Sequence, residues 1–262
     1  MALKVLFIGD IVGSPGRKAV KAFLPGLVER HSIDVVIANG ENAAGGFGLT
    51  EPVASDLFGL GIHVITSGNH VWDKKEGVAY IAREEKVLRP VNYPPGVPGF
   101  GSCVLEAREG VRLAVMNAMG RVFMPNTDCP FRASDEAVAR LRLEADAIVA
   151  DFHAEATSEK LAYGYYLDGR VSAVVGTHTH VQTADERVLP GGTAYITDVG
   201  MTGPAESVIG VEKEIIIERF LTAMPARFEV AGGPVILSAV VIGIDELTGL
   251  ASSIERVQIV RD

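Results

Sequence analysis

Four of the six histidines in this chain follow short apolar segments, as do several acidic and amide residues. The most compact group lies in GTHTHVQT, residues 176–183, where His178 and His180 are one residue apart. Neutral imidazole is a common ligand of transition metals, and alternate side chains of an extended chain point to the same side. Two histidines at this spacing can also be ordinary polar residues of a surface loop, so the pair alone does not establish a metal site.

The other candidate ligands come directly after further predicted strands. They are Asp10 after residues 4–8, Glu41 and Asn42 after 34–38, Asn69 and His70 after 63–66, and His153 after 147–152. Ligand sites of open α/β sheets lie beyond the carboxyl ends of the strands, so these side chains are expected to meet at one edge. A glycine precedes the ligand-type residue in four of the five turns, which permits a sharp backbone path. Each residue has an ordinary structural role available, but their joint occurrence predicts a metal site.

The types of donor restrict which metal this site would hold. Carboxylate, amide and imidazole groups together suit Mn, Fe, Ni or Zn better than Ca or Mg. The eight candidate side chains exceed the needs of one ion with four to six ligands. Two ions roughly 3.5–4 Å apart, bridged by a carboxylate, would use them well. The sequence therefore predicts a dinuclear transition-metal centre.

The elements that must position these residues alternate between strand and helix in the first half of the chain. Strands are predicted at 4–8, 34–38, 63–66, 147–152, 171–175 and 193–197, and helices at 16–30, 50–60, 134–146 (with Ser134 as N-cap) and 211–222. A hairpin is predicted around residues 108–110, and two further strands from Pro234 onward. Strand–helix–strand succession predicts a parallel sheet and an α/β fold.

Length and charge restrict the number of domains and the kinds of partner that are expected. The 262 residues, 48% of them hydrophobic, predict a single domain over 1–262 with a small cap or rim segment near 92–132. The net charge of -9 argues against an extended nucleic-acid surface but allows a small anionic substrate at a bound metal. Cys103 and Cys129 are too few for a disulfide framework. Without a signal-peptide pattern or a membrane-spanning apolar run, a cytoplasmic protein is expected, and a homo-oligomer is left open.

Six stretches together carry a resemblance to a known family. They are GDIVGSPGR (9–17), NGENAAGGFGLT (39–50), TSGNHVWD (66–73), DFHAEATSEK (151–160), GTHTHVQTAD (176–185) and TDVGMTGP (197–204). The chain resembles the calcineurin-like metallophosphoesterases and, more closely, their bacterial YmdB-type branch, whose members act as cyclic-nucleotide phosphodiesterases. The resemblance implies two packed mixed sheets flanked by helices, with a dinuclear site on the rim.

The resemblance also implies a role for each candidate residue. It assigns Asp10, Glu41, Asn42 and His180 to the first metal, Glu41, Asn69, His153 and His178 to the second, and the role of general acid to His70. Gly45 and Gly46 would let the backbone approach the substrate closely. For Arg17 and Asn92, a structural role is as consistent with the sequence as a role in the site.

The chain departs from the broader superfamily at the first metal. Usual members carry Asp-x-His after the first strand, where this chain has Asp10 followed by Ile11 and Val12, and Asp in the second turn, where it has Glu41. Asn42 is placed to replace the missing histidine. These are the variations of the YmdB branch itself. A first site richer in oxygen favours Fe or Mn over Zn, although Zn remains open.

The resemblance implies hydrolysis of small phosphodiesters, 2′,3′-cyclic nucleotides or related esters. A hydroxide bridging the two metals would attack phosphorus, and His70 would protonate the departing ribose oxygen. One alternative is a metal-dependent amide hydrolase, but amidohydrolase barrels carry His-x-His after their first strand, and here it occurs late in the chain. A second is a metal-binding regulatory or RNA-associated protein with vestigial catalysis.

Overall fold

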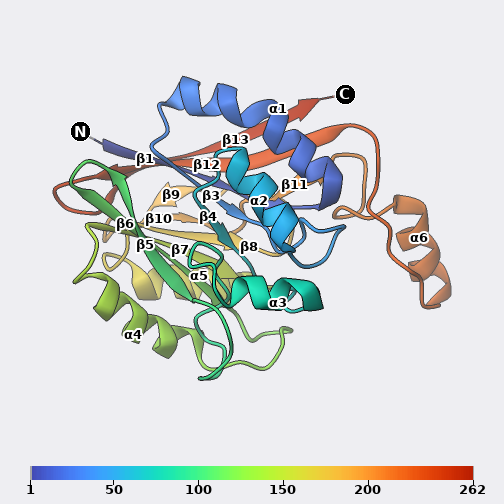
Figure 1. The fold of residues 1–262 in the computed structure, drawn as a ribbon, viewed down its shortest axis with the longest axis horizontal. Coiled ribbons are helices and arrows are strands. Elements are labelled where there is room, and N and C mark those ends of the chain that lie inside the picture. The colour runs from blue at the N-terminus through green and yellow to red at the C-terminus, as the bar shows by residue number, and fades with distance from the viewer. Residues whose placement is uncertain (1, 262) are drawn as a thin grey trace.

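The computed structural model describes residues 2–261 and contains two sheets that lie face to face between helices (Figure 1). The first sheet has the order β2 (Asp10–Ile11), β11 (Met201–Pro204), β12 (Val235–Asp245), β1 (Ala2–Ile8), β3 (Val35–Asn39), β4 (Val64–Thr66), with β13 (Ala251–Arg261) also on β12. The second has the order β5 (Ser102–Arg108), β6 (Val111–Met119), β7 (Ala147–His153), β8 (Ala173–Thr177), β10 (Ala194–Ile196), β9 (Arg187–Val188). The predicted α/β class with two mixed sheets is confirmed.

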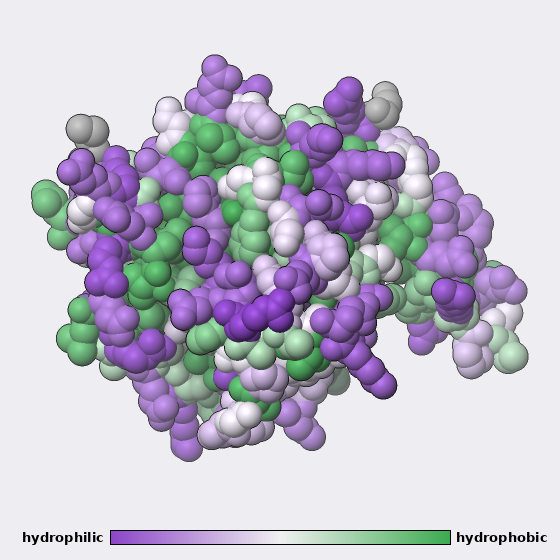
Figure 2. All heavy atoms as spheres, viewed as in Figure 1, coloured by the Kyte–Doolittle hydropathy of each residue, from purple (hydrophilic) through white to green (hydrophobic). Residues whose placement is uncertain are grey.

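The helices form the outer layers of the molecule. Helices α1 (Gly13–His31) and α2 (Glu51–Gly59) cover the first sheet, and α4 (Pro130–Leu141) and α5 (Thr157–Leu167) cover the second. Helix α3 (Lys75–Ile81) follows the turn after β4, and α6 (Lys213–Thr222) projects from the body (Figure 1). On the face seen in Figure 2, hydrophilic and apolar residues are interspersed, in keeping with a chain that is 22% charged.

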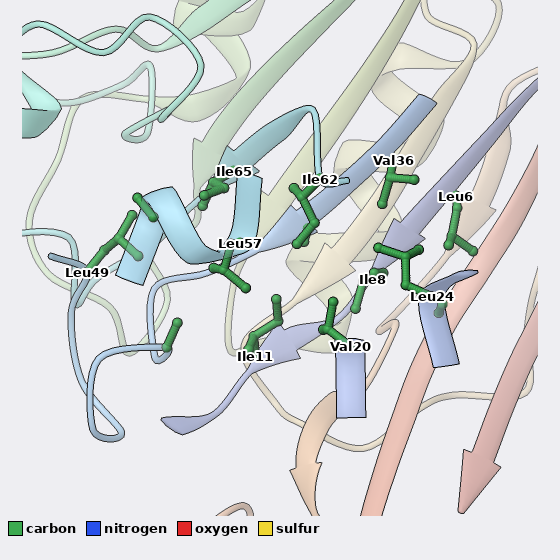
Figure 3. Packing of buried hydrophobic residues seen from close by; sticks show 14 of the residues in the cluster. Leu6, Ile8, Ile11, Val20, Leu24, Val36, Leu49, Leu57, Ile62 and Ile65 are labelled. Carbon is green, nitrogen blue, oxygen red and sulfur yellow. The ribbon is translucent and has the colours of Figure 1, made fainter. Parts of the chain in front are cut away.

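Strand β1 shows why two sheets are needed to bury this sequence. Its side chains alternate between faces: Leu6 and Ile8 pack under α1, and Val5 and Phe7 face the second sheet. Figure 3 shows Leu6 and Ile8 beside Leu24 of α1. Each fully buried apolar side chain of this size contributes about 1.5–3 kcal/mol to folding. The apolar layer between the sheets thus holds the two sheets together.

The candidate ligands lie at the ends of strands from both sheets. Strands β1, β3 and β4 are parallel, as predicted, and so are β6, β7 and β8 in the second sheet. A side-chain hydrogen bond joins the two rows, because Asn39 Nδ2 at the end of β3 donates to Asp151 Oδ2 in β7 over 3.2 Å. The site therefore spans the rims of two stacked sheets, as the resemblance implied, whereas the order of the strands alone predicted the edge of one.

Some local predictions need correction. The helix expected at 134–146 begins at Pro130, whose fixed φ suits a first helical turn. Ser134 is therefore not its cap but a buried residue inside α4, with Oγ 2.5 Å from the hydroxyl of Tyr163. Helix α3 was not predicted, and α1 continues through Pro25.

The hairpin predicted around residues 108–110 is confirmed as β5 and β6, which join the second sheet. These two strands thus occupy the middle of the segment near 92–132 that was predicted as a cap or rim, with irregular chain on either side of them. Cys103 and Cys129 are both free. Within residues 2–261, none of the helices combines the length and apolarity that crossing a bilayer requires.

Candidate metal centre

Three potential ligand atoms converge on Nε2 of His153, a fully buried residue at the end of β7. Its Nε2 lies 3.1 Å from Glu41 Oε1, 3.0 Å from Asn69 Oδ1 and 3.0 Å from His178 Nδ1. Glu41 is also buried, and Glu41, His153 and His178 form a group whose ligand atoms all lie within 4.8 Å of one another. A cluster of this kind has the donors and the spacing to enclose a cation.

The tautomer of His153 is set by the residues behind it. Thr177 donates its single hydroxyl proton to Asp151 Oδ1 over 2.7 Å. Its oxygen must therefore accept the Nδ1 proton of His153 over 2.9 Å. In the neutral ring, Nε2 then carries a lone pair toward Glu41 and Asn69. Such outer hydrogen bonds commonly orient histidines that bind metals.

His178 is held in the matching tautomer by Glu155. The His178 Nε2 atom lies 3.1 Å from Glu155 Oε2, so its proton points to that carboxylate and Nδ1 offers a lone pair. Burial, and then repulsion from His153, lowers the pKa of His178 to about 3, which keeps the ring neutral. Lone pairs of three side chains thus face the lone pair of His153, an arrangement that only a cation or a proton can stabilise.

The electrostatic environment around His153 Nε2 strongly favours a positive charge there. Burial alone would lower the pKa of His153, but the charge of Glu41 and its hydrogen bond outweigh burial and raise this pKa to about 9. Conversely, burial would raise the pKa of Glu41, but His153 lowers it to about 2. In the protein without metal, a proton on His153 Nε2 can interact with the lone pairs that surround this atom. A divalent ion would displace that proton on binding.

The second half of the cluster centres on Asp10, which is fully buried at the start of β2. Its Oδ2 accepts the backbone N–H of His178 over 3.2 Å, while Oδ1 has no hydrogen-bond partner among the described residues. The His180 Nε2 atom lies 3.8 Å from that Oδ1, and Nδ1 donates to the carbonyl of Ile209 over 2.9 Å. A buried carboxylate oxygen without a donor is costly unless a cation completes it. Burial raises the pKa of Asp10. The largest opposing effect is the charge of His180, which lowers this pKa.

Asn42 lies between the two halves. Its Nδ2 donates to Glu41 Oε1 over 3.4 Å and lies 3.3 Å from His180 Nε2. To bind a metal through its oxygen, the amide group has to rotate by half a turn. The structure thus brings together all seven predicted ligands, with Asn42 the one whose ligand atom faces away.

The turn that carries His178 and His180 has an unusual backbone. Their φ angles are 101° and 65°, in the region that favours glycine. Asp198 fixes the turn from below, because Oδ2 accepts both the N–H of Thr179 over 3.0 Å and its hydroxyl over 2.7 Å. The same oxygen lies 2.6 Å from Nζ of the buried Lys160. A buried ion pair therefore supports the strained turn.

The glycines before the ligands serve close packing. Gly9, Gly40, Gly68 and Gly176 all lack positive φ angles. A Cβ on Gly68 would lie 2.1 Å from His153 Cδ2, and one on Gly176 would lie 1.8 Å from the carbonyl oxygen of Thr197. Glycine was therefore predicted at these positions for the wrong reason. The backbone there does not need the special conformations of glycine, but the neighbouring atoms leave no room for a side chain.

His70 lies beside the cluster. Its Nδ1 is 2.7 Å from Asp73 Oδ2, its ring packs edge-on against Phe47 with centroids 5.0 Å apart, and its backbone N–H donates to Glu41 Oε2 over 3.1 Å. Together with Glu41, Asn42, His178 and His180 it lines a cavity of about 290 Å³. An imidazole in this place can exchange a proton with a molecule in the cavity.

Two residues left open by the sequence have structural contacts. Arg17 Nη1 donates to the carbonyl of Ala43, and the buried Asn92 amide donates to the carbonyls of Met119 and Asp128. Sequence reasoning did not single out the residues that orient the ligands, which are Asn39, Asp151, Glu155, Lys160, Thr177 and Asp198. All six fall inside the quoted family-like stretches, so those stretches were the available signal.

The chain matches known proteins over almost its whole length. The profile of the family described as YmdB-like protein matches residues 6–257. The 2′,3′-cyclic-nucleotide 2′-phosphodiesterase of Bacillus subtilis (strain 168) is 54% identical over 257 residues, which cover 98% of this chain and 97% of that protein.

Two solved structures share the whole fold. A hypothetical protein from Thermus thermophilus superposes with a TM-score of 0.93 at 45% identity, covering 99% of this chain and 100% of that one. A novel phosphatase from Mycoplasma pneumoniae superposes with a TM-score of 0.94 at 37% identity, covering 100% of this chain and 95% of the other.

Two stacked sheets with histidine, carboxylate and amide donors at their shared rim define a metallophosphoesterase. Within that class, the chain belongs to the family of YmdB-like proteins. The family predicted from the quoted stretches is confirmed. The predicted enzyme class, a metal-dependent phosphodiesterase, agrees with the activity for which the Bacillus subtilis relative is named.

Proposed function

We propose that this chain hydrolyses small phosphodiesters, with 2′,3′-cyclic nucleotides as the principal substrates, by means of two transition-metal ions. The observation that carries the proposal is the convergence of lone pairs from Glu41, Asn69 and His178 on Nε2 of His153, at 3.0–3.1 Å. The substrate class is suggested by the name of the Bacillus subtilis relative.

The residues present fit two ions that share one carboxylate. Glu41 Oε1 faces His153, while Oε2 receives the N–H of His70, so the two oxygens point in different directions. We assign Glu41, Asn69, His153 and His178 to one ion, and Asp10, Glu41, Asn42 and His180 to the other. The second set is richer in oxygen, which favours Mn or Fe over Zn.

The reaction would combine the chemistry of the bound ions with that of His70 and Asp73. When bound, the ions would lower the pKa of a water molecule toward neutrality and neutralise charge on the phosphate oxygens. His70 protonates the oxygen that leaves phosphorus. The Asp73 carboxylate, 2.7 Å from Nδ1, orients the imidazole.

The cavity argues for a small substrate. A volume of about 290 Å³ lies at the low end of the range for ligand pockets and accommodates roughly one nucleotide. The alternative of an amide hydrolase built on a barrel does not fit a fold of two stacked sheets. A regulatory protein with vestigial catalysis would keep the same ligands, so activity must decide between the two.

The proposal predicts turnover of bis-p-nitrophenyl phosphate by the purified protein. A chelator such as EDTA should abolish the release of p-nitrophenolate, and added Mn²⁺ or Fe²⁺ should restore it, because the donors alone do not activate water. The same assay with 2′,3′-cyclic AMP then tests the natural ester. Metal-replete protein that turns over neither ester would support the vestigial alternative and contradict the proposed function.

A further inference from the structure

The cavity at the metal centre has two chemically different walls. One wall consists of Glu41, Asn42, His70, His178 and His180. A second part of the lining, named here the apolar wall, consists of Val12, Ile209, Val211, Phe228 and Val230. Metal ligands and an acid need only the first wall, so the second requires a separate explanation.

Except for Val12, the apolar wall is built by the two segments that precede and follow α6. Residues 207–212 and 228–231 pair with each other, because Val211 forms a bridge with Val230, and the N–H of Ala231 donates to the carbonyl of Gly210 over 3.0 Å. The carbonyl of Ile209 accepts the Nδ1 proton of His180 over 2.9 Å. This contact fixes the apolar wall at a set position relative to the metal ligands.

Phe47 also lines the cavity, where its ring packs edge-on against that of His70. It lies in a loop where Gly45, Gly46 and Gly48 have φ angles of 73°, 99° and 74°. A Cβ on Gly46 would lie 2.8 Å from Val230 Cγ2, so the loop and the apolar wall are already in close contact. The Phe47 side chain nevertheless remains 36% exposed, which leaves part of its ring available to a ligand.

The charges of the lining restrict what this wall can bind. All the lining residues are described, and none of them is Lys or Arg; the one charged side chain on this side is Glu229. A second phosphate group would therefore meet an acidic carboxylate and no cation. A flat uncharged ring would gain apolar burial and aromatic stacking.

We propose that the apolar wall is the subsite for the nucleobase, with Phe47 as its stacking platform. This inference rests on the proposed function, because it supplies the part of the substrate that the metals do not contact. The reacting phosphate lies at the ligand wall beside His70, and the base lies between Phe47 and the residues around Val230. The subsite accepts any base, since every base has a flat face, and it disfavours nucleotides that carry an additional phosphate.

The test compares a cyclic phosphodiester that carries a nucleoside with one that carries neither base nor ribose. Metal-loaded wild type and Phe47→Ala are assayed with 2′,3′-cyclic AMP and with glycerol 1,2-cyclic phosphate, which has the same ring but no base. Loss of one base–aromatic stack should lower kcat/KM for cyclic AMP by about tenfold, mainly through KM, with glycerol 1,2-cyclic phosphate changed less than about twofold. Phe47→Tyr should restore the wild-type value, and Phe220→Ala, on α6 outside the cavity, should have no effect.

A binding measurement separates this inference from the proposed function. Equilibrium dialysis of adenosine 3′-monophosphate and glycerol 2-phosphate needs no turnover, and Phe47→Ala should weaken only the former. If wild type hydrolyses neither ester, the proposed function fails, and the dialysis result alone decides the subsite. Equal losses on the two esters would show that Phe47 acts only by supporting His70. That result, or unchanged binding of adenosine 3′-monophosphate, overturns the inference.

Discussion

Replacement of Glu41 by Gln is expected to lower metal content at both sites and to reduce activity by on the order of 10³-fold. A carboxylate has two charged oxygens for two cations, whereas Gln offers one neutral oxygen. Glu41 is almost fully buried, with one oxygen 3.1 Å from His153 Nε2 and the other 3.1 Å from the N–H of His70. Gln has nearly the same volume, so the fold should persist.

Glu51→Gln is the matched control for this variant. Glu51 begins α2 on the surface and pairs with Arg83, so its replacement should leave metal content and rate unchanged. Elemental analysis, the bis-p-nitrophenyl phosphate rate and a thermal unfolding curve are measured on both variants. A Glu41→Gln protein with full metal content and a near-normal rate would show that Glu41 only supports other ligands.

Replacement of His70 by Ala is expected to lower the rate by roughly 10²–10⁴-fold with esters whose leaving group is an alkoxide. His70 stands beside the ligands without belonging to either set, and Asp73 holds its Nδ1 at 2.7 Å. Both metals should remain bound. The loss should be much smaller with bis-p-nitrophenyl phosphate, because p-nitrophenolate leaves without needing a proton.

Asp73→Asn provides a companion to His70→Ala. It keeps the imidazole but removes the charge of its partner, so a smaller loss with the same dependence on leaving group is expected. The comparison uses 2′,3′-cyclic AMP and bis-p-nitrophenyl phosphate on protein of known metal content. Equal losses on the two substrates in His70→Ala would remove His70 from the role of general acid.

The sequence was sufficient for the fold class and for the residues that gather at the rim. Buried strands such as residues 4–8 can be recognised by their apolar composition. Recognising a strand also identifies the residues at its carboxyl end. That argument is local, and it holds because parallel strands bring their carboxyl ends together. It could not show that the ends belong to two sheets, since pairing across the sheets depends on packing between distant segments.

Residues that orient the ligands could not be found by the same reasoning. The hydroxyl of Thr177 sets the tautomer of His153 only because Asp151 accepts its proton, and these three residues come from two strands. Lys160 likewise reaches Asp198 from a different element. Periodicity places such residues in strands or helices but does not reveal hydrogen-bond partners. The apolar wall and Phe47 were missed for a related reason, because residues around Phe47 and Val230 are distant in sequence.

The most direct test of this account is the metal content of the purified protein. The chain is stripped with a chelator, reconstituted with Mn²⁺ or with Fe²⁺ under anaerobic conditions, and freed of excess metal before elemental analysis. The donor set that surrounds His153 and Asp10 predicts about two ions per chain, with activity rising as the second is bound. One ion per chain at full activity, or none after reconstitution, would contradict the dinuclear centre.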